Sequence, residues 1–230
     1  MNILSFFLIF HLLVFLFCLY VLVQDDFVLL RKNVSMEQAF NLAFLVIFIG
    51  FLTARIVYIT LHFNPSFLNP IVFFAFPYYP GLSLIGEVAG GSLFLFLYAR
   101  YRKYPVARLF DFFSFSFFCA LSFGYLNTIL FEKKPLQSWD FLLSLSYLVV
   151  FILFSIIFLP LQRRGALKDG NLGLMVMLIF AVFAFALNVI QHAPKVIGIF
   201  CAEDFIILGF FAAAFLFIII RNNARKKTTK

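Results

Sequence analysis

Charged residues are scarce in this chain. Of its 230 residues, 18 are Lys or Arg and 10 are Asp or Glu, which is 12% in all, against about 25% in soluble globular domains. Apolar residues make up 64%, against about 45–50% in a soluble domain. This leaves too little polar surface to cover a water-exposed globule and too much apolar sequence for a disordered chain. The composition excludes a soluble enzyme and predicts a polytopic membrane protein.

Cysteine is also scarce and forms no pattern typical of a metal or redox site. Cys18, Cys119 and Cys201 lie in apolar runs, without a Cys-x-x-Cys pair or a nearby His, so we interpret them as small packed hydrophobic residues. The net charge of +8 comes from basic residues between apolar runs, where they set membrane orientation. We therefore expect no metal, no cofactor and no nucleic-acid partner.

Long apolar segments are what the chain has in abundance. A bilayer span needs about 20 apolar residues, and segments of about this length lie near 3–23, 39–61, 81–98, 109–130, 140–161, 171–191 and 205–220. The first lacks a preceding Lys or Arg and is too long for the apolar part of a signal peptide, so we predict a retained helix. A shorter run at 71–76 is predicted to be interfacial or re-entrant. The predicted fold is all-α: one seven-helix transmembrane domain over 1–220 and a basic cytosolic tail over 221–230.

The basic residues between these segments are unevenly distributed. The connections 24–38, 99–108 and 162–170, together with the tail, hold 14 of the 18 Lys and Arg residues. The alternate connections hold 3, and Arg55 lies inside the second segment. Cytoplasmic connections of membrane proteins are enriched in Lys and Arg. The pattern therefore predicts seven spans, with the N-terminus outside and the C-terminus inside.

Two ionisable residues lie within predicted spans, at a similar estimated depth. Arg55 and Glu87 are each about six residues, or ~9 Å, from the outer ends of the second and third segments. A charge at this depth costs about 2.5–3.5 kcal/mol on insertion scales, so it usually faces the bundle interior and has a partner or a role. We expect a salt bridge between them, either purely structural or part of a site.

Other polar residues are predicted near the same level. The candidate substrate-binding residues are Arg55, Tyr58, Ser83, Glu87, Asn127, Asn188 and His192. Asn127 and Asn188 have an alternative role as hydrogen-bonding contacts between helices, and an interfacial His is commonly just solvated. No catalytic residue is assigned. Gly86 and Gly90, spaced as GxxxG with Gly91 beside them, predict close packing of the third helix.

A series of short motifs runs through most of the chain. Thr53-Ala54-Arg55-Ile56-Val57-Tyr58 is followed by Phe67-Leu68-Asn69-Pro70, by residues 81–87, by a basic turn at 98–103, by Asp111, by residues 135–140 and by Arg163-Arg164-Gly165. In this order and spacing the motifs resemble those of the bacterial prolipoprotein diacylglyceryl transferases. The seven-span topology with an external N-terminus agrees with the same family.

The resemblance implies a multi-pass protein of the bacterial cytoplasmic membrane. An active member transfers a diacylglyceryl group from phosphatidylglycerol to the lipobox cysteine of a prolipoprotein signal segment. That chemistry needs a cation for the phosphate and help in deprotonating a thiol. The resemblance gives the first role to Arg55, with His192 as a substitute base.

The chain also departs from the family pattern. Ile85 stands where the family has His, and Glu87 where it has Gly. Residues 124–127 lack the family's Arg, and Ala184, Asn188 and His192 replace the Tyr, Arg and Glu of a later helix. Two functions stay open: a diverged transferase, or a non-catalytic lipid- or partner-binding protein on the same fold. A transporter or channel is disfavoured, because no mid-membrane charge, inverted repeat or paired broken helix is present.

Overall fold

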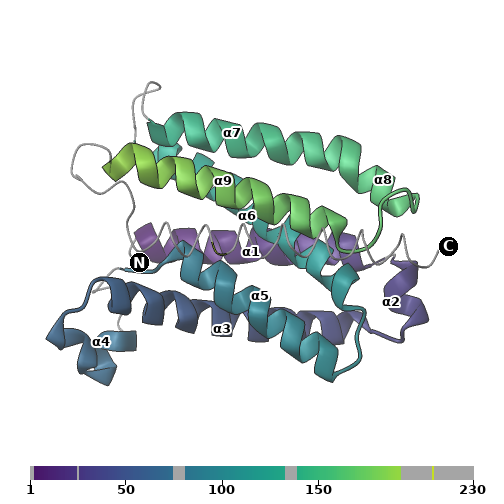
Figure 1. The fold of residues 1–230 in the computed structure, drawn as a ribbon, viewed down its shortest axis with the longest axis horizontal. Helices are drawn as coiled ribbons and strands as arrows, with labels where there is room; N and C mark the ends of the chain where they lie inside the picture. Colours follow the sequence, from purple (N-terminus) through teal and green to yellow (C-terminus); the bar gives the residue numbers. More distant parts are fainter. Residues whose placement is uncertain (1–2, 25, 75–80, 133–138, 193–208, 210–230) are drawn as a thin grey trace. The chain divides into compact units, whose positions relative to one another are not determined.

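The computed structural model describes residues 3–24, 26–74, 81–132, 139–192 and 209, and within these ranges the regular elements are all helical (Figure 1). Helices occupy six of the seven predicted segments: α1 (Ile3–Val23), α3 (Met36–Leu61), α5 (Leu84–Tyr101), α6 (Val106–Glu132), α7 (Trp139–Leu153) continuing into α8 (Leu159–Arg163), and α9 (Asn171–His192). The seventh segment lies outside the described residues, apart from Gly209. The all-α class is thus confirmed over the described part of the chain.

Several of these helices suit a membrane. Among the described residues, Met36–Leu61, Val106–Gly124 and Leu145–Arg163 are long and apolar enough to cross one, with mean hydropathies of 2.4, 1.5 and 2.3. Ile9–Val23 and Asn171–Ala186 are shorter apolar helices. The helices therefore support the predicted membrane protein.

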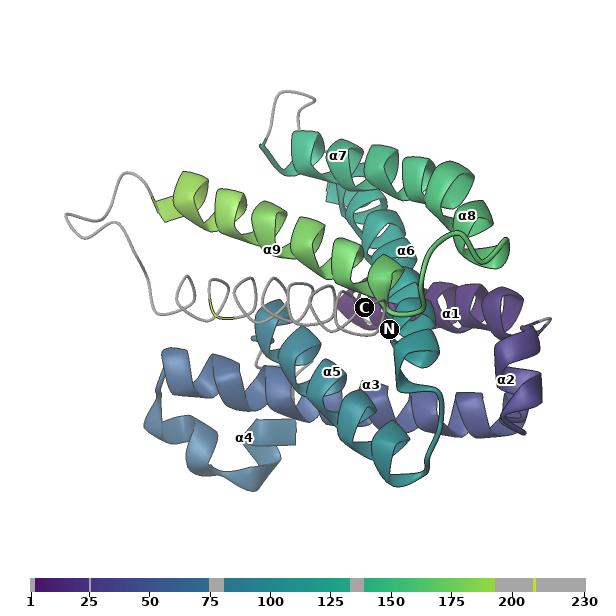
Figure 2. The ribbon, with the colours of Figure 1, turned by 45° about the vertical axis from the view of Figure 1, so that its right-hand side comes forward.

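The chain divides into two compact units, Met1–Leu172 and Gly173–Lys230. In the first unit α3 packs against α5, α1 packs against α6, and α6 packs against α7 (Figures 1 and 2). Smaller contacts join α5 to α6 and α1 to α3. The second unit contains α9 from Gly173 onward.

Local capping sets where the helices begin. Ser35 and Gln38 form a capping box, each side chain accepting from the other's backbone N–H, at 3.2 and 3.1 Å. This box starts α3 at Met36, three residues before the predicted segment. Ser83 is a simple N-cap of α5, and its hydroxyl accepts from the Gly86 N–H at 3.2 Å. Thus α5 begins at Leu84, after the first residues of the apolar run.

The fifth predicted segment is interrupted once but not ended. Phe154–Phe158 form a π-helical turn between α7 and α8, in which the Leu159 N–H donates to the Phe154 carbonyl. Pro160 follows directly. Proline lacks an N–H and its ring crowds the carbonyl four residues earlier, and a π turn changes that register. The helical path therefore continues to Arg163.

The predicted glycine packing of the third helix is confirmed at the α3–α5 contact. A Cβ on Gly86 would lie 2.8 Å from Cβ of Val57, and a Cβ on Gly90 would overlap the Thr53 side chain. Both glycines therefore let the two backbones approach closely. Gly91 has more room, since its Cβ would lie 3.5 Å from the nearest atom, on Val46.

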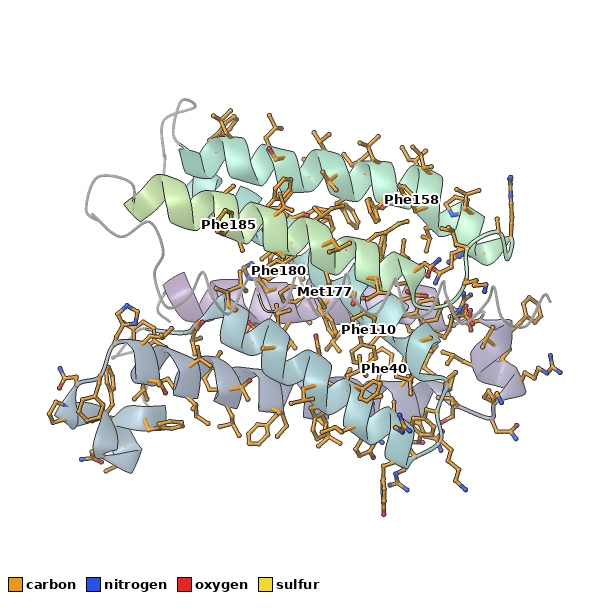
Figure 3. All side chains as sticks on the ribbon, in the orientation of Figure 1. Phe40, Phe110, Phe158, Met177, Phe180 and Phe185 are labelled. Carbon is orange, nitrogen blue, oxygen red and sulfur yellow. The ribbon has the colours of Figure 1, made fainter. Side chains whose placement is uncertain are left out.

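Phenylalanine fills much of the remaining helix contact. The side chains along the helices are mostly carbon, including Phe40 on α3 and Phe110 on α6 (Figure 3). At the α6–α7 contact, Phe118 is fully buried and its ring meets the Tyr147 ring edge-on at 5.5 Å. Phenylalanine therefore acts as hydrophobic filler at this contact.

Candidate functional site

Arg55 is completely enclosed by protein, with an exposed fraction of 0%. Its guanidinium donates to three backbone carbonyls: Nε to Phe73 at 3.1 Å, Nη2 to Val72 at 3.2 Å and Nη1 to Gly81 at 2.7 Å. It also lies over the Phe67 ring, 5.0 Å from the centroid. Arg55 therefore ties α3 to the connection between α3 and α5.

The connection between α3 and α5 has backbone carbonyls that need a hydrogen-bond donor, and the Arg55 guanidinium donates to them. It contains a 3₁₀ turn (Pro65–Leu68) and the short helix α4 (Pro70–Phe74), and Asn69 begins α4 by accepting from the Ile71 N–H at 2.9 Å. The last carbonyls of any helix lack helical partners, and cations near a helix C-terminus are favourable. Arg55 supplies this cap for α4. The run 71–76 was predicted to be interfacial or re-entrant; its described part lies in this short helix, and its place in the membrane stays a prediction.

The predicted salt bridge between Arg55 and Glu87 is wrong. Among the described residues Arg55 and Glu87 form no ion pair; the ion pairs recorded belong to Arg108. Glu87 meets α3 at Gly50, where its Cγ lies 3.3 Å from the position of a glycine Cβ. Gly50 is five residues before Arg55, or about 7.5 Å along the helix axis. Depth counted from the ends of apolar runs missed this offset, because the N-cap of α5, Ser83, lies at Ala54 and not at the end of α3, Leu61.

Ser83 and Tyr58 also hold the α3–α5 contact together. The Ser83 N–H donates to the Ala54 carbonyl at 3.1 Å, while its hydroxyl caps α5. The Tyr58 ring packs against Gly81, whose φ of +148° favours glycine, and stacks on His62 at 4.7 Å. The structure thus brings four predicted site residues, Arg55, Tyr58, Ser83 and Glu87, to one helix contact.

The remaining three predicted site residues have no described side chains. Asn127 lies in α6, and Asn188 and His192 lie in α9. Their side-chain positions fall outside the described part of the structure. Whether they approach Arg55 therefore stays a prediction.

Arg108 forms a buried ion cluster that was not predicted from the sequence. Its Nη2 and Nε donate to Oδ2 of Asp26 at 2.6 and 3.0 Å, and its Nη1 donates to Asp169 at 2.9 Å. Arg108 and Asp26 are each 6% exposed. From the sequence, Arg108 was counted among the basic residues that set the membrane orientation. The available signal was the acidic pair Asp25-Asp26, which follows the first apolar segment after Gln24.

A second buried contact lies close to Arg108 in sequence. Asp111 is fully buried, and its Oδ2 accepts from Nε2 of Gln162 at 2.5 Å and from the Gly170 N–H at 2.6 Å. This joins α6 to α8 and to the connection that follows α8. Hydrogen bonds of this kind offset the cost of burying a carboxylate.

Together, the Arg108 and Asp111 contacts bring three connections to one end of the first unit. These are 24–38, 99–108 and 162–170, the connections that charge counting grouped on one side. We call this end the basic end, since it carries nine of the ten described Lys and Arg residues, Arg55 being the tenth. The grouping of connections therefore rests on geometry as well as on charge.

The described residues contain no group of three His, Cys, Asp or Glu side chains arranged to hold a metal ion. No family model, no curated protein and no solved structure matches this chain. The resemblance to the diacylglyceryl transferases therefore stays a prediction that rests on the motifs and their order.

Proposed function

We propose that this chain is a seven-span protein of a bacterial cytoplasmic membrane, with its N-terminus outside and its C-terminus inside. On this proposal it keeps the transferase-family architecture and binds a membrane phospholipid, but does not transfer the diacylglyceryl group. The observation that carries the proposal is the enclosure of Arg55 by backbone carbonyls.

Transfer from phosphatidylglycerol needs a cation whose donors face the lipid phosphate. Arg55 is the one described Lys or Arg away from the basic end, and three of the five N–H donors of a guanidinium are directed at Phe73, Val72 and Gly81. With no exposed surface, the group is better suited to holding the α3–α5 connection than to holding a phosphate. The substitutions at Ile85 and in residues 124–127 remove further groups that the reaction uses in the family.

The binding part of the proposal is supported by the residues that persist. Tyr58, Ser83 and Glu87 share the α3–α5 contact with Arg55. Asn127, Asn188 and His192 stay lipid-binding candidates from the sequence alone. A phospholipid head group with hydroxyls fits such neutral and acidic partners. A membrane-embedded protein segment is the alternative ligand.

An active transferase is the second candidate, favoured by the order of motifs along most of the chain. Arg55, which has no exposed surface, would then have to become accessible, so that its two remaining N–H donors could reach a phosphate. His192 would serve as the base that takes the thiol proton.

Two measurements on the purified full chain, together with a growth test in cells, separate these functions. The first incubates the chain with labelled phosphatidylglycerol and a lipobox peptide, with a complete transferase as positive control. We expect no diacylglyceryl-modified cysteine by mass spectrometry, and no growth rescue of a transferase-depleted bacterium. The second is native mass spectrometry, in which we expect a retained phospholipid. Transfer that disappears in Arg55→Gln would establish the second candidate, and a chain that retains no phospholipid would contradict the binding part.

A further inference from the structure

The short helix α2 (Phe27–Arg31) lies at the basic end, between α1 and α3. Its first turn is fixed by Asp26, whose Oδ1 accepts from the N–H groups of Val28 and Leu29 at 3.1 and 3.0 Å. The other oxygen of the same carboxylate receives Arg108. One side chain therefore both caps α2 and anchors it to α6.

The far end of α2 is fixed equally firmly. Asn33 has a φ of +52°, in the left-handed region that asparagine tolerates better than most residues. After it, the Val34 N–H donates back to the Leu29 carbonyl at 3.0 Å. Leu29 and Val34 are 1% and 3% exposed. They hold one face of α2 against the unit.

The opposite face of α2 is open. Phe27 and Leu30 are 84% and 61% exposed, and beside them a groove of about 400 Å³ is lined by Phe27, Val28, Arg31 and Lys32. Large apolar side chains next to Arg and Lys are typical of helices that lie in the membrane interface. The apolar groups reach the acyl chains there, and the basic groups reach the phosphates.

The charge of this end is mostly positive: the described residues there include nine Lys or Arg and four acidic residues, of which Glu37, in the first turn of α3, is exposed. Asp26, Asp111 and Asp169 are engaged by Arg108, by Gln162 and by a backbone N–H. Among the described residues, Arg31 and Lys32 form no ion pair. The groove therefore presents two basic side chains whose complement is a negative group.

We propose that the groove beside α2 binds an anionic phospholipid of the leaflet that surrounds the basic end. Arg31 and Lys32 contact the head-group phosphate, and Phe27 and Leu30 contact the acyl chains. Basic residues at a membrane surface each contribute roughly a fivefold preference for anionic lipid at moderate salt. This site is separate from the one proposed at the α3–α5 contact and does not depend on it.

The chain offers a clean test because it has a single tryptophan, Trp139. The full chain carrying Trp139→Phe and Phe27→Trp is reconstituted in phosphatidylcholine nanodiscs with equal fractions of brominated phosphatidylglycerol or brominated phosphatidylcholine. Bromine quenches tryptophan on contact. We expect severalfold stronger quenching by the brominated phosphatidylglycerol, diminishing at high salt.

The added changes Arg31→Gln and Lys32→Gln should remove the difference between the two lipids. Arg163→Gln with Arg164→Gln removes the same charge from α8 and its C-cap and should leave the difference in place. Equal quenching by the two lipids in the parent would show no selection of an anionic head group. Absence of quenching would show that α2 does not meet lipid, and loss of the difference in the control pair would assign it to net charge. Each of these three outcomes overturns the proposal.

Discussion

Arg108 and Asp26 stand 82 positions apart in the chain and meet at 2.6 Å in a buried ion pair. The pair joins the turn after α1 to the first turn of α6, and Asp169 extends it to the connection before α9. Since Asp26 also caps α2, a single carboxylate fixes the relation of three helices. The basic end is therefore an organised part of the fold, and its charges do more than set orientation.

Removing the cation from this pair should destabilise the chain strongly. In Arg108→Ala the buried Asp26 carboxylate loses its partner, and breaking a buried pair in this way costs about 3–5 kcal/mol. We expect a lower midpoint of thermal unfolding in detergent. Arg108→Lys keeps the charge but loses the forked geometry that reaches both Asp26 and Asp169. Its unfolding midpoint should therefore fall between those of the parent and Arg108→Ala.

The matched control for this change is Arg163→Ala, which removes an exposed arginine from the same end. Its unfolding midpoint should stay close to that of the parent, because exposed charges contribute little. Equal losses from Arg108→Ala and Arg163→Ala would mean that the buried pair has no special role.

Hydropathy predicted the helices well because it reads a local property. The α1 bounds agree with the predicted segment, and five further helices fall within a few residues of theirs. The small errors come from capping, as at Ser35 and Ser83, where one side chain decides the first turn. The GxxxG spacing of Gly86 and Gly90 was also enough to predict close helix packing.

The polar contacts were much harder to predict, because they depend on which helices meet and at what offset. Nothing local relates Arg108 to Asp26, and an arginine in a basic connection is ordinarily solvated. Arg55 was predicted to face the interior, yet its partners are backbone carbonyls. Every residue has such a carbonyl, so residue types do not show which ones accept from Arg55. A depth estimate with an error of about 7 Å was enough to pair it wrongly with Glu87.

The α3–α5 contact predicts opposite results at two adjacent glycines. A Cβ on Gly90 would overlap Thr53, so Gly90→Ala should separate the helices and lower the unfolding midpoint, as overpacking costs about 1–3 kcal/mol. Gly91→Ala should be neutral or stabilising, because its Cβ has ordinary contact distances and alanine favours a helix by about 1 kcal/mol. Similar losses at both positions, measured by thermal unfolding in detergent, would contradict the observed packing.

Arg55 and Glu87 should behave as independent residues. Arg55→Ala removes hydrogen bonds to three carbonyls and should cost about 2–4 kcal/mol, with faster hydrogen exchange in α4. Because the two side chains share no partner, Arg55→Ala combined with Glu87→Ala should give the sum of the single effects within about 0.5 kcal/mol. If the double variant recovered part of the loss, Arg55 and Glu87 would interact after all, as the predicted salt bridge required.

The proposed orientation can be tested by cysteine labelling, and the structure requires three of the labelled positions to lie on the same side of the membrane. Single cysteines at Lys32, Arg102 and Ala166, in a chain without Cys18, Cys119 and Cys201, lie in the three connections that the Arg108 and Asp111 contacts bring together. They must therefore react alike, whichever side of the membrane they face. The excess of Lys and Arg predicts the cytoplasmic side, so an impermeant maleimide should label them only after the cells are opened.

Phe63→Cys, in the connection at the other end of α3, and Gln137→Cys, in the predicted outer connection 131–139, should react in intact cells. Reversed labelling of all five would invert the topology, whereas divided labelling among the first three would contradict the buried network itself.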